Sequence, residues 1–275
     1  MRLSHSKCHI NFSMILIHLA QRGGGDVGDV KLSDLIAVQT AVREHFGWNY
    51  HDDVISANEM GKAMSVATPF GVVNWSPIER QKTLNELKLK LASADKVVIV
   101  GASANEHDID DLDADECVVI AADGSVGAVG GVANLACVVT DFDGNPYLEK
   151  AADGGTIFIA HAHGDNRDTW QQSLTRWSRM ASPPRLILTH QVTESIEGME
   201  NYGGFTDGDR AVCLALALGV GLDRISLVGF STTVIGKWSG QTEPVQKFEK
   251  LKWMLKILQV LGLGDQVSTN ASLEH

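Results

Sequence analysis

The chain has 275 residues, enough for one large domain or two small ones, and its 44% hydrophobic and 21% charged residues are ordinary for a soluble globular protein. Its formal net charge of −11 argues against duplex nucleic acid and anionic membranes as main partners, because both select basic surfaces. An anionic small ligand is still compatible with this charge, since cations can mediate the contact.

The beginning of the chain and its cysteines indicate a cytosolic protein. The apolar stretch 10–20 is too short to span a bilayer as a helix, and no small-residue cleavage site follows it. We therefore expect a packed or poorly ordered start, with a signal peptide as the alternative. The cysteines have no zinc-ligand spacing and are expected to be reduced core residues of a cytoplasmic protein: Cys8, Cys117, Cys137 and Cys213.

Residues 1–95 are predicted to be mainly helical. An apolar stripe from Leu32 to Val42 predicts a helix with Ser33 as a possible cap and Gly47 as its possible end. A capping-box pattern at Ser56 predicts a second, short helix that runs toward Val66.

The strongest helix-start signal is Ser76-Pro77-Ile78-Glu79, which combines a capping box with proline at the first helical position. The helix that it opens is expected to run to about Ala94. Trp48 and Trp75, near the predicted loops, are expected to be core or interface anchors rather than ligand platforms.

Residues 96–240 are predicted to form a doubly wound, mainly parallel α/β domain of the Rossmann-like class. Six continuous apolar runs alternate with segments of helical potential, which is typical of parallel strands covered on both faces. The predicted strands are residues 97–100, 117–121, 136–139, 156–160, 185–188 and 225–228.

The remaining residues, 241–272, are predicted to form a closing amphipathic helix over 245–261. It packs on the sheet or on a second subunit, so a homodimer is possible. Residues 273–275 resemble the start of an expression tag.

Polar residues and glycines gather after the predicted strands, at the edge where open α/β sheets bind ligands. Asp141 and Asp143 follow the third strand and point the same way if the chain is still extended. Two such charges about 4 Å apart repel by roughly 4 kcal/mol at an effective dielectric near 20. A divalent cation would relieve this repulsion, whereas two solvated aspartates in a loop are the alternative.

Other polar residues near these strand ends have more than one interpretation. His161 and His163 would bind zinc, contact a phosphate or be structural, and Arg167 and Arg210 would hold phosphate or pair with Asp168 and Asp209. Thr206 or Asp207 would cap the helix that follows, whose amino end also favours an anion.

Several motifs of other enzyme classes are missing. The sequence has no GxxxxGK[ST] phosphate loop, no GxSxG elbow and no ordered GxGxxG, so a nicotinamide cofactor has little support. An acidic Mg²⁺ site that acts on phosphate is the chemistry that remains.

Four segments, in this order, resemble the archaeal-type 6-hydroxymethyl-7,8-dihydropterin pyrophosphokinases, whose core is similar to that of thiamin pyrophosphokinases: Ala122–Ser125, Val139–Gly144, His161–Asn166 and Gly203–Ala211. The resemblance implies Mg²⁺-dependent transfer of diphosphate from ATP to the hydroxymethyl group of a reduced pterin, with release of AMP. It also implies that both partners are small molecules, without nucleic acid or membrane.

The resemblance further assigns roles to single residues. Asp141 and Asp143 would hold Mg²⁺ with Asp165 as a further ligand, and Asp123 would be a ligand or the partner of the attacking hydroxyl. The implied nucleotide- and substrate-binding residues are Gly101, Ser103, Gly124, Asn166, Arg167, Gln191, Asn201, Thr206, Asp207, Asp209 and Arg210.

Three other functions remain open from the sequence. Asp-Phe-Asp-Gly after a strand is also the nucleophile motif of haloacid-dehalogenase-like phosphatases, in which Asp141 would attack phosphate and Asp143 would act as acid and base. A non-catalytic nucleotide-binding module would bind ATP without forming AMP. Thiamin could replace the pterin as acceptor, because the sequence does not determine the acceptor's pocket.

Overall fold

The computed structural model describes residues 32–110, 112, 117–129, 131, 134–240 and 243–269. Cys8, the apolar stretch 10–20 and the tag-like end 273–275 lie outside these residues. Within the described ranges, no helix is both long enough and apolar enough to cross a bilayer.

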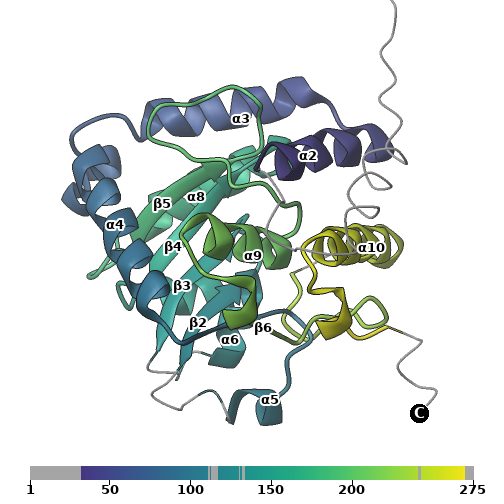
Figure 1. Cartoon of the computed structure of the whole chain (residues 1–275). Helices are drawn as coiled ribbons and strands as arrows, with labels where there is room; N and C mark the ends of the chain where they lie inside the picture. The colour runs from purple at the N-terminus through teal and green to yellow at the C-terminus, as the bar shows by residue number, and fades with distance from the viewer. Residues whose placement is uncertain are drawn as a thin grey trace, which may run out of the picture.

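A parallel six-stranded sheet forms the centre of the molecule and confirms the doubly wound α/β fold (Figure 1). Its spatial order is β5-β4-β3-β2-β1-β6. All six predicted strands are present, with ends shifted by two residues at most: β1 Lys96–Val100, β2 Cys117–Ala122, β3 Leu135–Thr140, β4 Ile157–Ala162, β5 Arg185–His190 and β6 Ile225–Val228.

The strand order creates a crevice at the carboxyl edge of the sheet. Strands β1 to β5 follow one another outward, and the chain then returns to place β6 on the other side of β1. The loops after β1 and β6 lie side by side at this point, where the Ser103 N–H donates to the Gly229 carbonyl at 2.9 Å, and open α/β sheets bind their ligands at such switch points. The functional site is expected beside this switch point.

Helices cover both faces of the sheet and bury most residues of its strands, although alternate residues of the edge strand β6 are only partly buried. Residues at alternate positions belong to separate cores, as Ile99 and Val100 of β1 do. One core contains residues of α2 (Leu32–Phe46), α4 (Pro77–Ser93), α9 (Asp207–Ala217) and α10 (Pro244–Val260). The other contains residues of α3 (Tyr50–Ala63), α6 (Val126–Val129), α7 (Tyr147–Ala152) and α8 (Arg167–Trp177).

The shorter helical elements lie in the connections. They are α5 (Glu106–Asp110) and the single-turn segments Pro69–Gly71, Val73–Trp75, Asp123–Ser125, Gly164–Asn166, Leu222–Arg224 and Gly264–Gln266.

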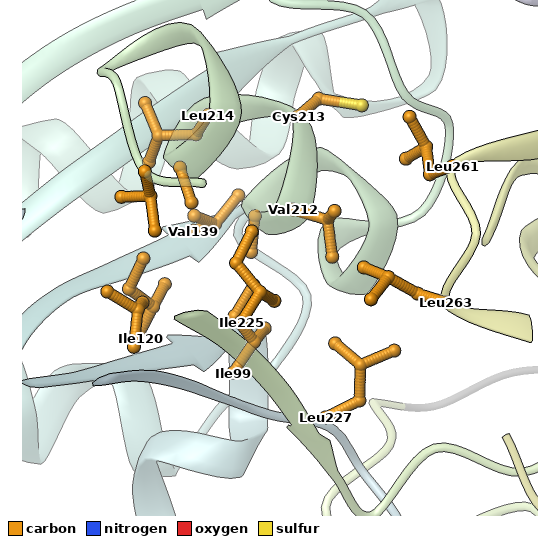
Figure 2. Close-up of a cluster of buried hydrophobic side chains, with 14 of the residues drawn as sticks. Ile99, Ile120, Val139, Val212, Cys213, Leu214, Ile225, Leu227, Leu261 and Leu263 are labelled. Atoms are coloured by element: carbon orange, nitrogen blue, oxygen red, sulfur yellow. The ribbon is translucent and has the colours of Figure 1, made fainter. Parts of the chain in front are cut away.

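The closing helix α10 is present as predicted and packs within its own chain. Figure 2 shows Ile99, Ile120 and Val139 of the sheet beneath Val212 of α9, with Leu261 and Leu263 completing the cluster just after α10. Helix α10 contacts α9 and α2. The first and last described helices therefore lie side by side over one face of the sheet.

The N-terminal helices differ from the prediction at two starts. Helix α2 begins at Leu32, so Ser33 lies inside its first turn, although the end at Gly47 is confirmed. Helix α3 begins at Tyr50, because the Asn49 side chain caps it by accepting from the backbone N–H of His51. Ser56 is therefore buried in mid-helix, where its hydroxyl accepts from the Trp170 indole at 3.2 Å.

The other local predictions are confirmed. The Ser76 hydroxyl caps α4, which ends at Ser93, and Trp75 is a core residue that donates to the Pro184 carbonyl at 2.6 Å. The described cysteines are buried core residues, as expected: Cys117, Cys137 and Cys213.

Candidate active site

Two strained loops bring the carboxylates together. Thr140, the last residue of β3, donates from its hydroxyl to Oδ1 of Asp123 at 2.6 Å and accepts from the backbone N–H of Phe142 at 2.7 Å. Asp123 and Phe142 have φ values of 51° and 77°, in the left-handed region that residues with a Cβ seldom adopt. Such strain costs about 1–3 kcal/mol per residue and is concentrated at functional sites.

Gly144 allows these loops to touch. A Cβ at this position would lie 2.3 Å from both Oδ2 of Asp123 and the backbone nitrogen of Gly124. Gly124 itself leaves space for the Trp238 carbonyl, which would lie 2.3 Å from a Cβ there. The glycine of Asp-Phe-Asp-Gly is therefore required by close packing between the second and third strand ends.

Oxygen atoms of Asp123, Asp141 and Asp143 lie within 4.8 Å of one another. Oδ1 of Asp141 is buried and has no hydrogen-bond partner among the described residues. Oxygen donors at this spacing are what Mg²⁺ prefers, and a buried lone carboxylate oxygen is the atom that a cation would complete. The triad therefore fits a magnesium ion.

The carboxylates of the site repel one another. Burial, followed by the charges of Asp143 and Asp207, raises the pKa of Asp123 well above its usual value. The charge of Asp141 raises the pKa of Asp143, with burial adding to the effect, and burial together with Asp141 raises the pKa of Asp207. Three carboxyls thus resist ionisation unless positive charge is supplied.

Asp141 behaves differently from its neighbours. Burial alone would raise its pKa, but the hydrogen bond and charge of His163 and the charge of Arg210 outweigh burial and lower the pKa of Asp141 below its usual value. Nε2 of His163 lies 3.3 Å from Oδ2 of Asp141, and Nη1 of Arg210 lies 3.9 Å from the same oxygen. Among the four buried aspartates of the site, Asp141 is therefore the one whose charged form the surroundings favour.

Arg210 is positioned by two polar neighbours. Its Nη1 donates to Oδ1 of Asp207 at 3.2 Å, and its Nη2 donates to Oε1 of Gln191 at 3.0 Å. Asp53 of α3 binds the amide nitrogen of Gln191 from the far side. The sequence did not indicate Asp53, because it lies on a helix with no link to the strand ends until the chain is folded.

These groups line one pocket at the carboxyl edge of the sheet. Ten of the predicted site residues line it: Gly101, Ser103, Asp123, Asp141, Asp143, Asp165, Gln191, Thr206, Asp207 and Arg210. Asp165 is exposed and lies outside the carboxylate triad. The loops after β1 and β6 meet here, which places the pocket at the switch point of the sheet.

Five predicted binding residues do not line the pocket. Besides Gly124, two of them hold backbone in place: the Asn166 amide donates to the carbonyls of His161 and Asp141, and Asp209 accepts from the N–H groups of Phe205 and Thr206. The other two pair with side chains elsewhere, Arg167 with Glu59 and Asn201 with Gln39.

The structure also shows which protein groups the remaining polar residues contact. Thr206 caps α9 in a reciprocal capping box with Asp209. Arg167 forms an ion pair with Glu59, and Arg210 forms ion pairs with Asp207 and Asp141, rather than with their sequence neighbours. His161 is buried against Thr189 and Gln191, and the histidines belong to no group of three or more potential metal ligands in the described ranges.

The pocket also has a wall that the sequence did not indicate. Trp48 lines it and stacks on Phe46, with ring centroids 4.6 Å apart, and Phe205 and Phe230 contribute further rings. Trp48 also packs against the core, as expected for a packing anchor. Helix α10 adds Lys247, Lys250, Leu251 and Met254 to the lining.

The relatives found by comparison with known proteins share one name. No protein-family model matches the chain. It is 35% identical over 177 residues to the 6-hydroxymethyl-7,8-dihydropterin pyrophosphokinase of Pyrococcus furiosus, covering 60% of this chain and 71% of the relative. It is 34% identical over 142 residues to the protein of the same name from Methanothermobacter thermautotrophicus, covering 47% and 56%. The chain therefore belongs to the 6-hydroxymethyl-7,8-dihydropterin pyrophosphokinase family, as its four segments indicated.

Proposed function

We propose that the protein transfers diphosphate from ATP to the hydroxymethyl oxygen of 6-hydroxymethyl-7,8-dihydropterin, in a Mg²⁺-dependent reaction that releases AMP. The observation that carries this proposal is the convergence of Asp123, Asp141 and Asp143 in a pocket with Arg210, in a member of this family. Phosphoryl-type transfer requires mainly positioning and charge neutralisation, which this arrangement can supply.

Asp141 and Asp143 would hold Mg²⁺, with Asp123 as a further ligand. The fit rests on the unpartnered Oδ1 of Asp141 and on carboxyl pKa values that only added positive charge would bring down. When bound, Mg²⁺ would neutralise phosphate charge and orient the diphosphate for in-line attack. Asp165, exposed at the pocket wall, would reach the metal only through water.

The chemistry forms one bond and breaks one. The hydroxymethyl oxygen bonds to the β-phosphorus, the bridge between the α- and β-phosphates breaks, and AMP leaves with the electron pair while the hydroxyl proton is released. Arg210 would bind phosphate oxygens at the centre of the pocket, because its guanidinium is already fixed by Asp207 and Gln191. Asp123, if not a metal ligand, would orient the attacking hydroxyl.

The aromatic wall suits the flat rings of the substrates. Trp48, Phe205 and Phe230 line the pocket beside the carboxylates, and both the pterin and adenine carry a planar heterocycle. The Gln191 amide and the Thr206 hydroxyl are polar groups at this wall that would contact ring edges. Family membership favours the reduced pterin over thiamin as acceptor.

The test is AMP release from ATP and Mg²⁺ with each acceptor in turn. We expect AMP with the reduced pterin, little with thiamin, and loss of activity in Asp141→Asn with the exposed Asp95→Asn as control. AMP formation with neither acceptor would contradict the proposal. A trapped phosphoaspartate at position 141 would instead establish the phosphatase reaction.

A further inference from the structure

Helix α10 places two lysines over the pocket. Lys247 and Lys250 are three residues apart, which puts them on the same face of the helix, and both line the pocket with Leu251 and Met254. Nζ of Lys250 lies 5.3 Å from the centroid of the Trp48 ring. The lysine face of α10 thus lies between the aromatic wall and the carboxylates.

Neither lysine forms a salt bridge with another described residue, whereas Lys252, on the same helix, pairs with Glu249. Both lysines nevertheless line the same pocket as the acidic groups and interact electrostatically with them, both with Asp143, Lys247 also with Asp207 and Lys250 also with Asp141. The amino end of α10 is occupied by the Glu243 carboxylate, so the positive charge over the pocket comes from these side chains.

The balance of charge in the pocket indicates what the lysines bind. Five carboxylates line the pocket against three permanent cations, Arg210, Lys247 and Lys250. The Arg210 guanidinium already donates to Asp207 and Gln191. A polyphosphate entering such a site meets repulsion that a metal ion relieves only in part, and flexible ammonium groups at the rim are suited to offset the rest.

We propose that Lys247 and Lys250 bind the β- and γ-phosphates of the nucleotide, the group that is transferred, and so close the pocket from above. This inference rests on the proposed function, since it takes a nucleoside triphosphate as the donor. Both lysines line the pocket together with Asp141 and Asp143, the residues that would hold the metal bound to the diphosphate, and this assigns them to the transferred diphosphate and not to the AMP portion.

Calorimetric titration with α,β-methylene-ATP and Mg²⁺ tests this assignment, because this analogue keeps the β- and γ-phosphates and cannot undergo the transfer. Lys247→Gln and Lys250→Gln should each weaken binding of the analogue roughly tenfold or more, as expected for a lost charge-assisted hydrogen bond, and change AMP affinity less than twofold. Lys247→Arg and Lys250→Arg should recover much of the loss, since they keep the charge. Lys252→Gln is the matched control and should bind like the wild type.

Three results would overturn the proposal. If both glutamine variants bind the analogue like the wild type, the lysines only shield the carboxylates. If AMP affinity falls by the same factor, or if the wild type does not bind the analogue, the lysines do not contact the transferred phosphates. A wild-type protein that shows the expected binding pattern but releases no AMP with the pterin would refute the transfer reaction and leave the lysine assignment intact.

Discussion

The amide nitrogen of Gln191 donates to both carboxylate oxygens of Asp53, at 3.0 and 2.9 Å. Because the nitrogen faces Asp53, the amide oxygen must face Arg210, from which it accepts at 3.0 Å. Asp53 is itself held by the backbone N–H of Gly164 at 2.8 Å and by Arg43 of α2 at 3.4 Å. The N-terminal helices therefore orient an arginine of the pocket through one buried side chain.

Asp53→Asn should lower kcat/KM about tenfold. The new amide places an N–H donor opposite the N–H donor of Gln191. Because leaving one buried donor unpaired costs about 1–3 kcal/mol, the Gln191 side chain is expected to reorient and no longer hold Arg210 in place. Steady-state kinetics with ATP and the pterin measures the effect. Asp52→Asn, on the exposed side of the same helical turn, is the control and should remain close to wild type.

The double variant Asp53→Asn/Gln191→Glu should recover most of this activity. The carboxylate introduced at position 191 can accept from Arg210 with one oxygen and from the amide introduced at position 53 with the other, so every donor regains an acceptor. If the double variant is no better than Asp53→Asn, the pair has only a structural role and does not position Arg210.

Asp123→Asn should inactivate the enzyme and at the same time stabilise the metal-free fold. Removing one of three crowded carboxylates relieves repulsion, while the asparagine oxygen still accepts from Thr140. We expect at least a hundredfold loss of AMP release, and a melting temperature in EDTA at pH 8 raised by about 2–4 °C, the shift that corresponds to roughly 1 kcal/mol. A lower melting temperature than that of wild type would show that the carboxylates do not repel one another as described.

The stabilisation that Mg²⁺ gives should be larger at pH 8 than at pH 5.5. The pKa values of Asp123, Asp143 and Asp207 are raised in the folded protein, whereas in the unfolded chain these groups lose their protons near pH 4. Above that pH the folded state therefore binds more protons than the unfolded state, and the free energy of unfolding of the metal-free protein falls as the pH rises. The lowered pKa of Asp141 has the opposite effect. Its charged form stabilises the fold above about pH 4, and this stabilisation is lost when the pH falls further. Protons compete with the metal for the same oxygens.

Melting curves with and without Mg²⁺ at the two pH values test this prediction. The difference in melting temperature should grow with pH in the wild type and much less in Asp123→Asn. An increment that is the same at both pH values would place the metal away from these carboxyls.

Gly144→Ala should destroy the site. Its methyl group would lie 2.3 Å from Oδ2 of Asp123 and from the Gly124 nitrogen, so the two strand-end loops must move apart. We expect loss of activity of at least a hundredfold and destabilisation by about 1–3 kcal/mol, as for overpacking elsewhere. Gly154→Ala, whose methyl group would find its nearest neighbour at 3.5 Å, is the matched control and should stay active.

Much of the sheet and its acidic edge could be predicted from the sequence because both depend on local patterns. Continuous apolar runs such as Val97–Val100 are long enough to identify buried parallel strands. Asp123, Asp141 and Asp143 directly follow two neighbouring strands, so strand order alone brings them to the same edge.

The residues that sequence reasoning missed, or placed elsewhere, depend on tertiary contacts. Lys250 lies on an amphipathic helix, where a lysine ordinarily faces solvent, and only the packing of α10 against α9 and α2 turns it toward the pocket. Asn166 and Asp209 were expected to bind ligand, but their hydrogen bonds hold backbone groups of adjacent loops. Ser56 matched a capping pattern because a short motif does not show that Asn49 has already begun the helix.

The position of α10 against α2 has a consequence for protein engineering. A fragment trimmed to residues 96–240 would retain every strand of the sheet and every acidic side chain of the triad, and yet lose Trp48 from one flank and both pocket lysines from the other. Chimaeras that exchange only the central α/β unit between related proteins would therefore receive the carboxylate triad without the aromatic and lysine residues that line the rest of the pocket. Crossover points in such chimaeras belong before α2 and after α10.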